Sequence, residues 1–203
     1  MLTCVLLICG AAGLAKPPFE QSPAELNHTI QSAQGSHEDW NARVVALARA
    51  HLGQPYALYL LGEAPFETID PEPIWRHDKS DCVVFVEHIL AYSLSDNLRD
   101  AVRLLQRIRY TGGHISVLTR NHYTEADWNI HNDWLLDDIT TRVGGDAVQQ
   151  YDLKIDRAKF FRDRYKLETE HPVQTMKVDF IPIEAMKEAQ KRLRDGDVVN
   201  FVY

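Results

Sequence analysis

The sequence has little positive charge for its size. Its 22 lysines and arginines are outnumbered by 29 aspartates and glutamates, which gives a formal net charge of -7. This balance excludes a large basic surface of the kind that neutralises nucleic-acid phosphates, so we expect no nucleic-acid partner. The rest of the composition, 45% apolar and 25% charged residues, is that of an ordinary globular protein with one sizeable core.

Charged side chains are absent from the first fifteen residues, which form an apolar stretch that ends in small residues. This pattern is typical of a signal peptide, and we expect residues 1–15 to be removed by cleavage after Ala15. The stretch is too short to span a bilayer. We therefore expect a periplasmic or otherwise exported protein of the cell envelope, with no stable membrane insertion after cleavage. A buried N-terminal strand is the alternative interpretation.

Cysteine is also scarce, with three residues at Cys4, Cys9 and Cys82. Signal cleavage would leave Cys82 as the only thiol in an oxidising compartment, which makes it a candidate nucleophile. A small buried hydrophobe and an intermolecular disulfide are the alternatives for such a cysteine. The histidines match no metal-ligand spacing such as HExxH, so we expect no metal and no other cofactor.

The pattern along the chain predicts a flexible N-terminal segment followed by one folded domain. Residues 16–35 are polar and contain three prolines, as expected for a flexible segment, and residues 36–203 form the domain. The domain belongs to the α+β class, with helices first and an antiparallel sheet after them. Helical spacing and capping residues predict helices at 37–52, from Cys82 to Ser93, after Asn97, at 157–165 and at 183–193. Strands are predicted at 139–143, 149–155, 174–181 and 197–203.

Cys82 falls at the predicted start of an amphipathic helix. Amide groups at a helix N-terminus favour a thiolate and can stabilise an oxyanion during acyl transfer. Asp81 precedes the cysteine, and its carboxylate disfavours a second negative charge nearby, so we expect it to cap the helix or to face a substrate. Position alone therefore gives Cys82 the setting of a nucleophile.

A cysteine nucleophile also needs a base within hydrogen-bond reach. The candidates within the chain are His114, His122 and His131, whereas His88 lies too far along the cysteine helix. The segment that runs from Arg109 to residue 128 is dense in groups that bind sugars and peptides. A loop that tethers two helices, with His122 as a cap, is an equal alternative. The remaining histidines are predicted to lie on the surface: His28, His37, His51, His77 and His171.

Several motifs, taken in order, resemble those of the NlpC-type papain-like peptidoglycan hydrolases. The resemblance is to the branch of unknown function that is described as N-acetylmuramoyl-L-alanine amidase-like, and it covers roughly residues 40–203. The first two motifs are the segments 52–56 and 81–87. The others are found at 108–110, 122–123, 127–128, 132, 138–140, 180–182 and 196–199.

The resemblance implies a papain-like fold in which the cysteine helix packs on the antiparallel sheet. It also implies cleavage of a murein amide, between an anhydromuramoyl sugar and L-alanine, with a muropeptide as the substrate. Cys82 would attack the lactyl carbonyl, and Tyr56 would lie near the thiol. Residues that would bind the substrate or support those that do are Asp81, Arg109, His122, Tyr123 and Asp138.

One departure from the family concerns the base. In the family the base histidine lies on the strand that follows segment 196–203, with its orienting residue later still, and neither is found in this sequence. We therefore expect the antiparallel sheet to be incomplete at its C-terminal end and the 203-residue polypeptide to be inactive or nearly so. A non-catalytic muropeptide-binding remnant is the alternative. A second departure is Val83, where a small polar residue is usual.

Overall fold

The computed structural model describes residues 16–37 and 39–202 of the chain. The predicted signal peptide, residues 1–15, lies outside the described residues, as does the last residue of the predicted final strand. Within the two described ranges, no helix combines the length and the apolar character that a membrane crossing requires.

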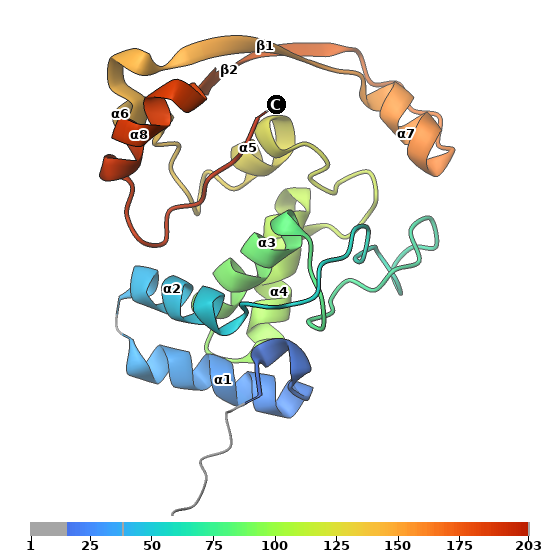
Figure 1. Ribbon diagram of the computed structural model, residues 1–203. Helices are drawn as coiled ribbons and strands as arrows, with labels where there is room; N and C mark the ends of the chain where they lie inside the picture. Colours follow the sequence, from blue (N-terminus) through green and yellow to red (C-terminus); the bar gives the residue numbers. More distant parts are fainter. Residues whose placement is uncertain (1–15, 38, 203) are drawn as a thin grey trace, which may run out of the picture.

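The first half of the chain is a layer of four helices. They are α1 (Pro23–Ser36), α2 (Trp40–Ala50), α3 (Cys82–Ser93) and α4 (Leu98–Arg109). Helix α3 is the centre of this layer and packs against the other three (Figure 1). Its inward face is apolar and joins the main core, whose buried members are Leu26, Ile30, Val44, Leu47, Ile89, Tyr92 and Ala101. The layer therefore packs α3, the helix that begins at Cys82, against three other helices.

Helix α1 corrects the prediction that residues 16–35 form a flexible segment. Ser22 and Glu25 form a capping box at its start, in which each side chain binds the other residue's backbone amide. Leu26 and Ile30, one turn apart, are completely buried. Two apolar side chains in a polar segment are enough to fix this helix on the core, because an (i, i+4) pair lies on one face.

The second half consists of short helices and one hairpin-like sheet. Strands β1 (Gln149–Ile155) and β2 (Gln174–Phe180) pair antiparallel and in full register, and α7 (Arg157–Tyr165) lies between them in sequence. The remaining α-helices are α5 (Asn129–His131), α6 (Thr140–Gly144) and α8 (Met186–Ala189). Single turns of 3-10 or π-helix are found at Pro18–Glu20, Thr111–Gly113, Thr124–Trp128, Gly145–Ala147, Ile183–Ala185 and Gln190–Arg192.

The predicted α+β class is confirmed, since the described residues contain eight α-helices and a two-stranded antiparallel sheet. Three details of the prediction are wrong. Residues 140–143 belong to helix α6, and just before it Asp138 accepts a hydrogen bond from Thr140 N–H at 2.8 Å, a local side-chain bond that competes with strand pairing. Residues 197–202 form no strand. The cysteine helix packs on other helices, whereas the sheet runs along the opposite edge of the molecule and contacts α6 (Figure 1).

Candidate active site

Cys82 is the first residue of α3, and its thiol is free and exposed. Asp81 is the residue before the helix, and its Oδ1 accepts a hydrogen bond from Val84 N–H at 2.8 Å. Of the two roles predicted for Asp81, this is the capping role. The bond uses one of the free amide groups of the first turn and leaves the sulfur at the helix end open to solvent.

The chain that precedes Cys82 is held against the loop that carries Tyr56. Tyr56 and Ser80 form a parallel bridge, in which Ala57 N–H donates to Ser80 O and Ser80 N–H donates to Pro55 O, both at 3.1 Å. The Tyr56 phenol is 68% exposed, beside the start of α3. Local desolvation and the negative charges of Cys82 and Asp81 raise the pKa of Tyr56. Tyr56, Asp81 and Cys82 therefore form one group.

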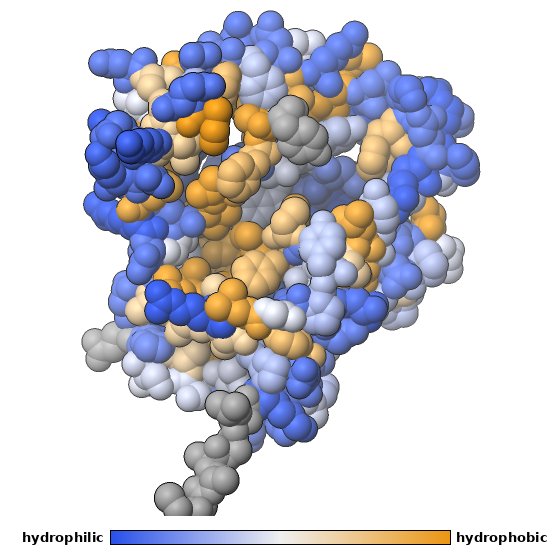
Figure 2. Space-filling view, viewed as in Figure 1, coloured by the Kyte–Doolittle hydropathy of each residue, from blue (hydrophilic) through white to orange (hydrophobic). Residues whose placement is uncertain are grey.

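An apolar hollow opens on the face of the molecule shown in Figure 2, between the helical layer and the layer that contains the sheet and α8. Apolar side chains are exposed both beside the cysteine and in the last described segment. Val83 is 40% exposed, and Val198, Val199 and Phe201 are exposed as well. An apolar group of a ligand could therefore contact Val83 beside the cysteine.

Arg109 is predicted either to bind the substrate or to support the residues that do. Its side chain is buried in the core and pairs with Glu87 of α3, with Nη1 2.8 Å from Oε2. Trp128 Nε1 donates to the other carboxylate oxygen of Glu87 at 3.0 Å. Burial raises the pKa of Glu87, while the Arg109 charge opposes that effect. This buried pair fixes α4 against α3 behind Cys82.

Two histidines near α3 are also buried. His51, for which the sequence predicts a surface position, is only 3% exposed and stacks on Tyr92 with ring centroids 6.0 Å apart. His88 stacks on the same tyrosine at 5.5 Å. Burial lowers the pKa of His88 to about 3. These rings form part of the core, because a neutral imidazole tolerates burial far better than a charged one.

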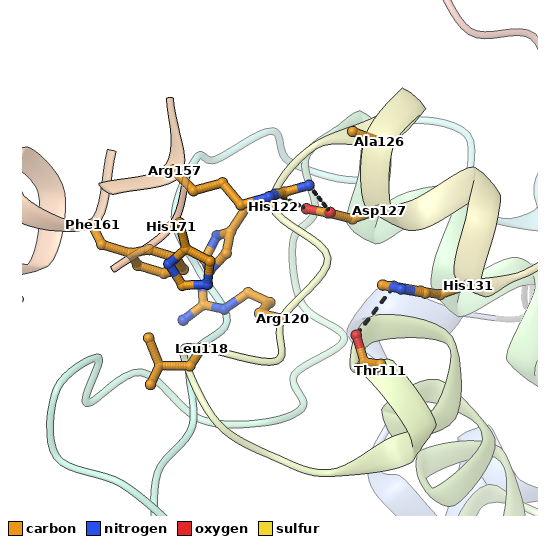
Figure 3. Close-up of a pocket in the computed structure, with 10 residues that line it drawn as sticks. All are labelled: Thr111, Leu118, Arg120, His122, Ala126, Asp127, His131, Arg157, Phe161 and His171. Atoms are coloured by element: carbon orange, nitrogen blue, oxygen red, sulfur yellow. Dashed lines mark hydrogen bonds and ion pairs between the residues drawn. The ribbon is translucent and has the colours of Figure 1, made fainter. Parts of the chain in front are cut away.

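His122 and Tyr123 belong to a second group of residues. His122 lines a cavity of about 240 Å³, together with His131, Arg157 and others, as Figure 3 shows. Its Nε2 donates to Val117 O at 2.7 Å, and its ring packs against Phe160 and Phe161. Burial lowers the pKa of His122 to about 4.

The charged groups around this cavity are already paired with one another. Arg157 forms an ion pair with Asp127 at 2.6 Å and lies over the Tyr123 ring. Arg120 binds Glu63 at 2.6 Å and Asp70 at 2.9 Å. Sequence reasoning missed these pairs, because their members are distant in sequence and no local pattern joins them.

The structure therefore brings three of the predicted site residues together and separates the others. Tyr56, Asp81 and Cys82 are adjacent, whereas His122 lines the cavity and Tyr123 stacks under Arg157, which also lines it. Asp138 is exposed and binds the backbone of α6. Among the described residues, no hydrogen bond joins a histidine to Cys82.

A family model described as AmiA-like, N-acetylmuramoyl-L-alanine amidase-like, matches residues 46–203. The chain belongs to this family, which confirms the resemblance drawn from its motifs. No curated protein matches the sequence.

Two solved structures are similar to the chain. A Legionella pneumophila protein with the family designation DUF1460 superposes with a TM-score of 0.72 over 85% of this chain and 70% of that one, at 22% identity, which shows a shared fold. A protein of Bacteroides uniformis described as an N-acetylmuramoyl-L-alanine amidase superposes with a TM-score of 0.50 at 25% identity. That comparison covers 63% of this chain, which spans about half, 53%, of the Bacteroides protein.

Proposed function

We propose that this protein is an envelope cysteine amidase whose nucleophile is Cys82 and whose target is the muropeptide bond between the lactyl carbonyl of muramic acid and L-alanine, with very weak turnover by these 203 residues alone. The observation that carries the proposal is the exposed thiol of Cys82 at the first position of α3, in a chain that belongs to the AmiA-like family. The family designation supports a peptidoglycan substrate. Export to the periplasm or another part of the cell envelope is part of the proposal.

In the proposed reaction the Cys82 thiolate attacks the lactyl carbonyl carbon. The carbon–nitrogen bond then breaks, a thioester forms, and the nitrogen takes up a proton and leaves as the amino group of L-alanine. Water hydrolyses the thioester, which releases the lactyl carboxylate and restores the sulfur. In this proposal the free amides of the first turn of α3 stabilise the oxyanion of both tetrahedral intermediates.

Alkylation of the thiol tests whether Cys82 is activated. In protein with Cys4→Ser and Cys9→Ser, we expect iodoacetamide at pH 6 to modify Cys82 about tenfold faster than it modifies glutathione, because reactivity follows the thiolate fraction. Mass spectrometry at successive times measures both rates. The Cys82→Ser variant is the control and takes up no label. A rate no higher than that of glutathione would contradict an activated nucleophile and favour a non-catalytic muropeptide-binding protein.

Turnover by these 203 residues is proposed to be very weak. Among the described histidines, none is hydrogen-bonded to Cys82, and His122 is held by Val117 O in an aromatic pocket. We expect chromatography of an anhydromuramoyl peptide to show no more product with this chain than with its Cys82→Ala variant. Hydrolysis that the Cys82→Ala substitution abolishes would overturn this expectation and identify a base within the chain.

A further inference from the structure

Arg164, in the last turn of α7, lies against a loop that is distant from it in sequence. Its guanidinium carbon is 3.9 Å from the centroid of the Tyr59 ring. The neighbouring cations of the helix have acidic partners, since Arg162 pairs with Glu168 at 3.5 Å and Lys159 pairs with Asp163. Within the described part of the chain, Arg164 has no ion-pair partner, and its side chain is exposed.

A guanidinium that stacks on an aromatic face keeps its hydrogen-bonding edge free. The five N–H groups lie in the plane of the guanidinium, so contact through the face leaves them available, while the cation–π attraction orients the group. Carboxylates bind such an edge through two parallel hydrogen bonds. Arg164 therefore presents a prepared site for a carboxylate.

Tyr59, on which Arg164 stacks, has an unusual backbone conformation. Its φ is +57°, in the left-handed region that bulky residues rarely adopt, and its side chain is 67% exposed. Leu60 and Leu61, which follow it, are buried and fix the turn. Conformations of this kind persist where the surrounding structure imposes them and are frequent at ligand sites.

A short stretch of chain joins the stacked pair to the candidate active site. Tyr59 is three residues from Tyr56, which lies beside the start of α3, so the two residues are at most about 10 Å apart along the chain. An extended dipeptide spans about 7 Å. The carboxylates of a muropeptide stem lie at distances of this order from its scissile amide, so Arg164 is a candidate partner for one of them when that amide is at Cys82.

We propose that Arg164, stacked on Tyr59, is a binding site for a carboxylate of the murein stem peptide and makes the protein selective for acidic stems. This inference rests on the proposed function, because it takes the same substrate. Arg164 acts on substrate binding and takes no part in bond cleavage.

Paired ligands test this site in Cys82→Ala protein, in which no turnover is possible. One ligand is N-acetylmuramoyl-L-alanyl-D-glutamate, and the other carries carboxamides in place of both glutamate carboxylates. We expect calorimetry to show the acidic ligand binding about tenfold or more tightly, as charge-assisted hydrogen bonds do. The Arg164→Ala substitution should remove that preference. Arg162→Ala is the matched control on the same helical turn and should retain it.

Variants of the aromatic partner separate stacking from charge. Tyr59→Phe keeps the ring and should keep the preference, whereas Tyr59→Ala should weaken it. Equal affinity for both ligands, binding of neither at millimolar concentration, or a preference that survives Arg164→Ala would each overturn the proposal. Alkylation of Cys82 does not involve Arg164, so failure of this site and failure of the nucleophile give different results.

Discussion

Replacement of Glu87 by alanine is expected to lower the free energy of unfolding by about 3–5 kcal/mol. The substitution leaves the Arg109 charge buried without its partner, which lies 2.8 Å away in the protein. It also removes the acceptor of the Trp128 indole N–H. Because a domain of this size is stable by only about 5–15 kcal/mol, the loss is a large share of the total. Urea unfolding at pH 7 measures it.

The controls for this prediction come from the same molecule. The exposed pair of Lys191 and Glu188 has a similar nitrogen–oxygen distance of 2.6 Å, but Lys191→Ala should cost less than about 1 kcal/mol, because water screens exposed pairs. The double variant Glu87→Met with Arg109→Met should recover much of the loss, since it leaves no unpaired buried charge. A loss below about 1 kcal/mol in Glu87→Ala would contradict the structural role assigned to the pair.

Acidification is expected to destabilise the protein steeply as the pH falls from about 6.5 towards 4. Burial lowers the pKa of His88 to about 3 and that of His122 to about 4, from an ordinary value of 6.5. In this window the unfolded chain binds protons at both positions and the folded chain binds few. The free energy of unfolding therefore decreases as the pH is lowered. The two histidines together can change the free energy of unfolding by at most about 2.7 kcal/mol per pH unit. The raised pKa of Glu87 acts in the opposite direction.

A substitution of His88 measures how much this one histidine contributes to the pH dependence of the free energy of unfolding. His88→Phe keeps a ring for stacking on Tyr92 and removes one titrating group, so the slope should fall by about 1.4 kcal/mol per pH unit. Urea unfolding at several pH values between 4 and 7 measures the slopes. Equal slopes for His88→Phe and the unaltered protein would show that His88 is not buried in a neutral form.

Features set by local interactions could be predicted from the sequence. Asp81 before Cys82 and Asn97 before Leu98 cap their helices as expected, because a cap joins side chain and backbone within three residues. The alternating pattern of 149–155 predicts the bounds of β1. Local patterns of this kind are sufficient to place the thiol of Cys82 at the start of a helix.

Features set by contacts between distant residues could not be predicted in this way. Arg109 is 22 residues from Glu87, and nothing local shows that its charge is neutralised inside the core. His51 is buried because tertiary packing places Tyr92 beside it. The stacking of Arg164 on Tyr59 joins two segments whose separate patterns carry no sign of each other. Sequence composition shows only which side chains are present, so it left open whether Arg109 binds the substrate or supports the residues that do.

An affinity label tests most directly whether Cys82 attacks the muramoyl carbonyl. The label is an N-acetylmuramic acid derivative whose lactyl carboxyl group is converted to a chloromethyl ketone, from which a thiolate displaces chloride to form a stable thioether. We predict one adduct per chain, on the peptide that contains Cys82, formed more slowly in the presence of excess muramoyl dipeptide and absent from Cys82→Ala protein. Labelling at other residues, or labelling that the muramoyl dipeptide does not slow, would contradict the account.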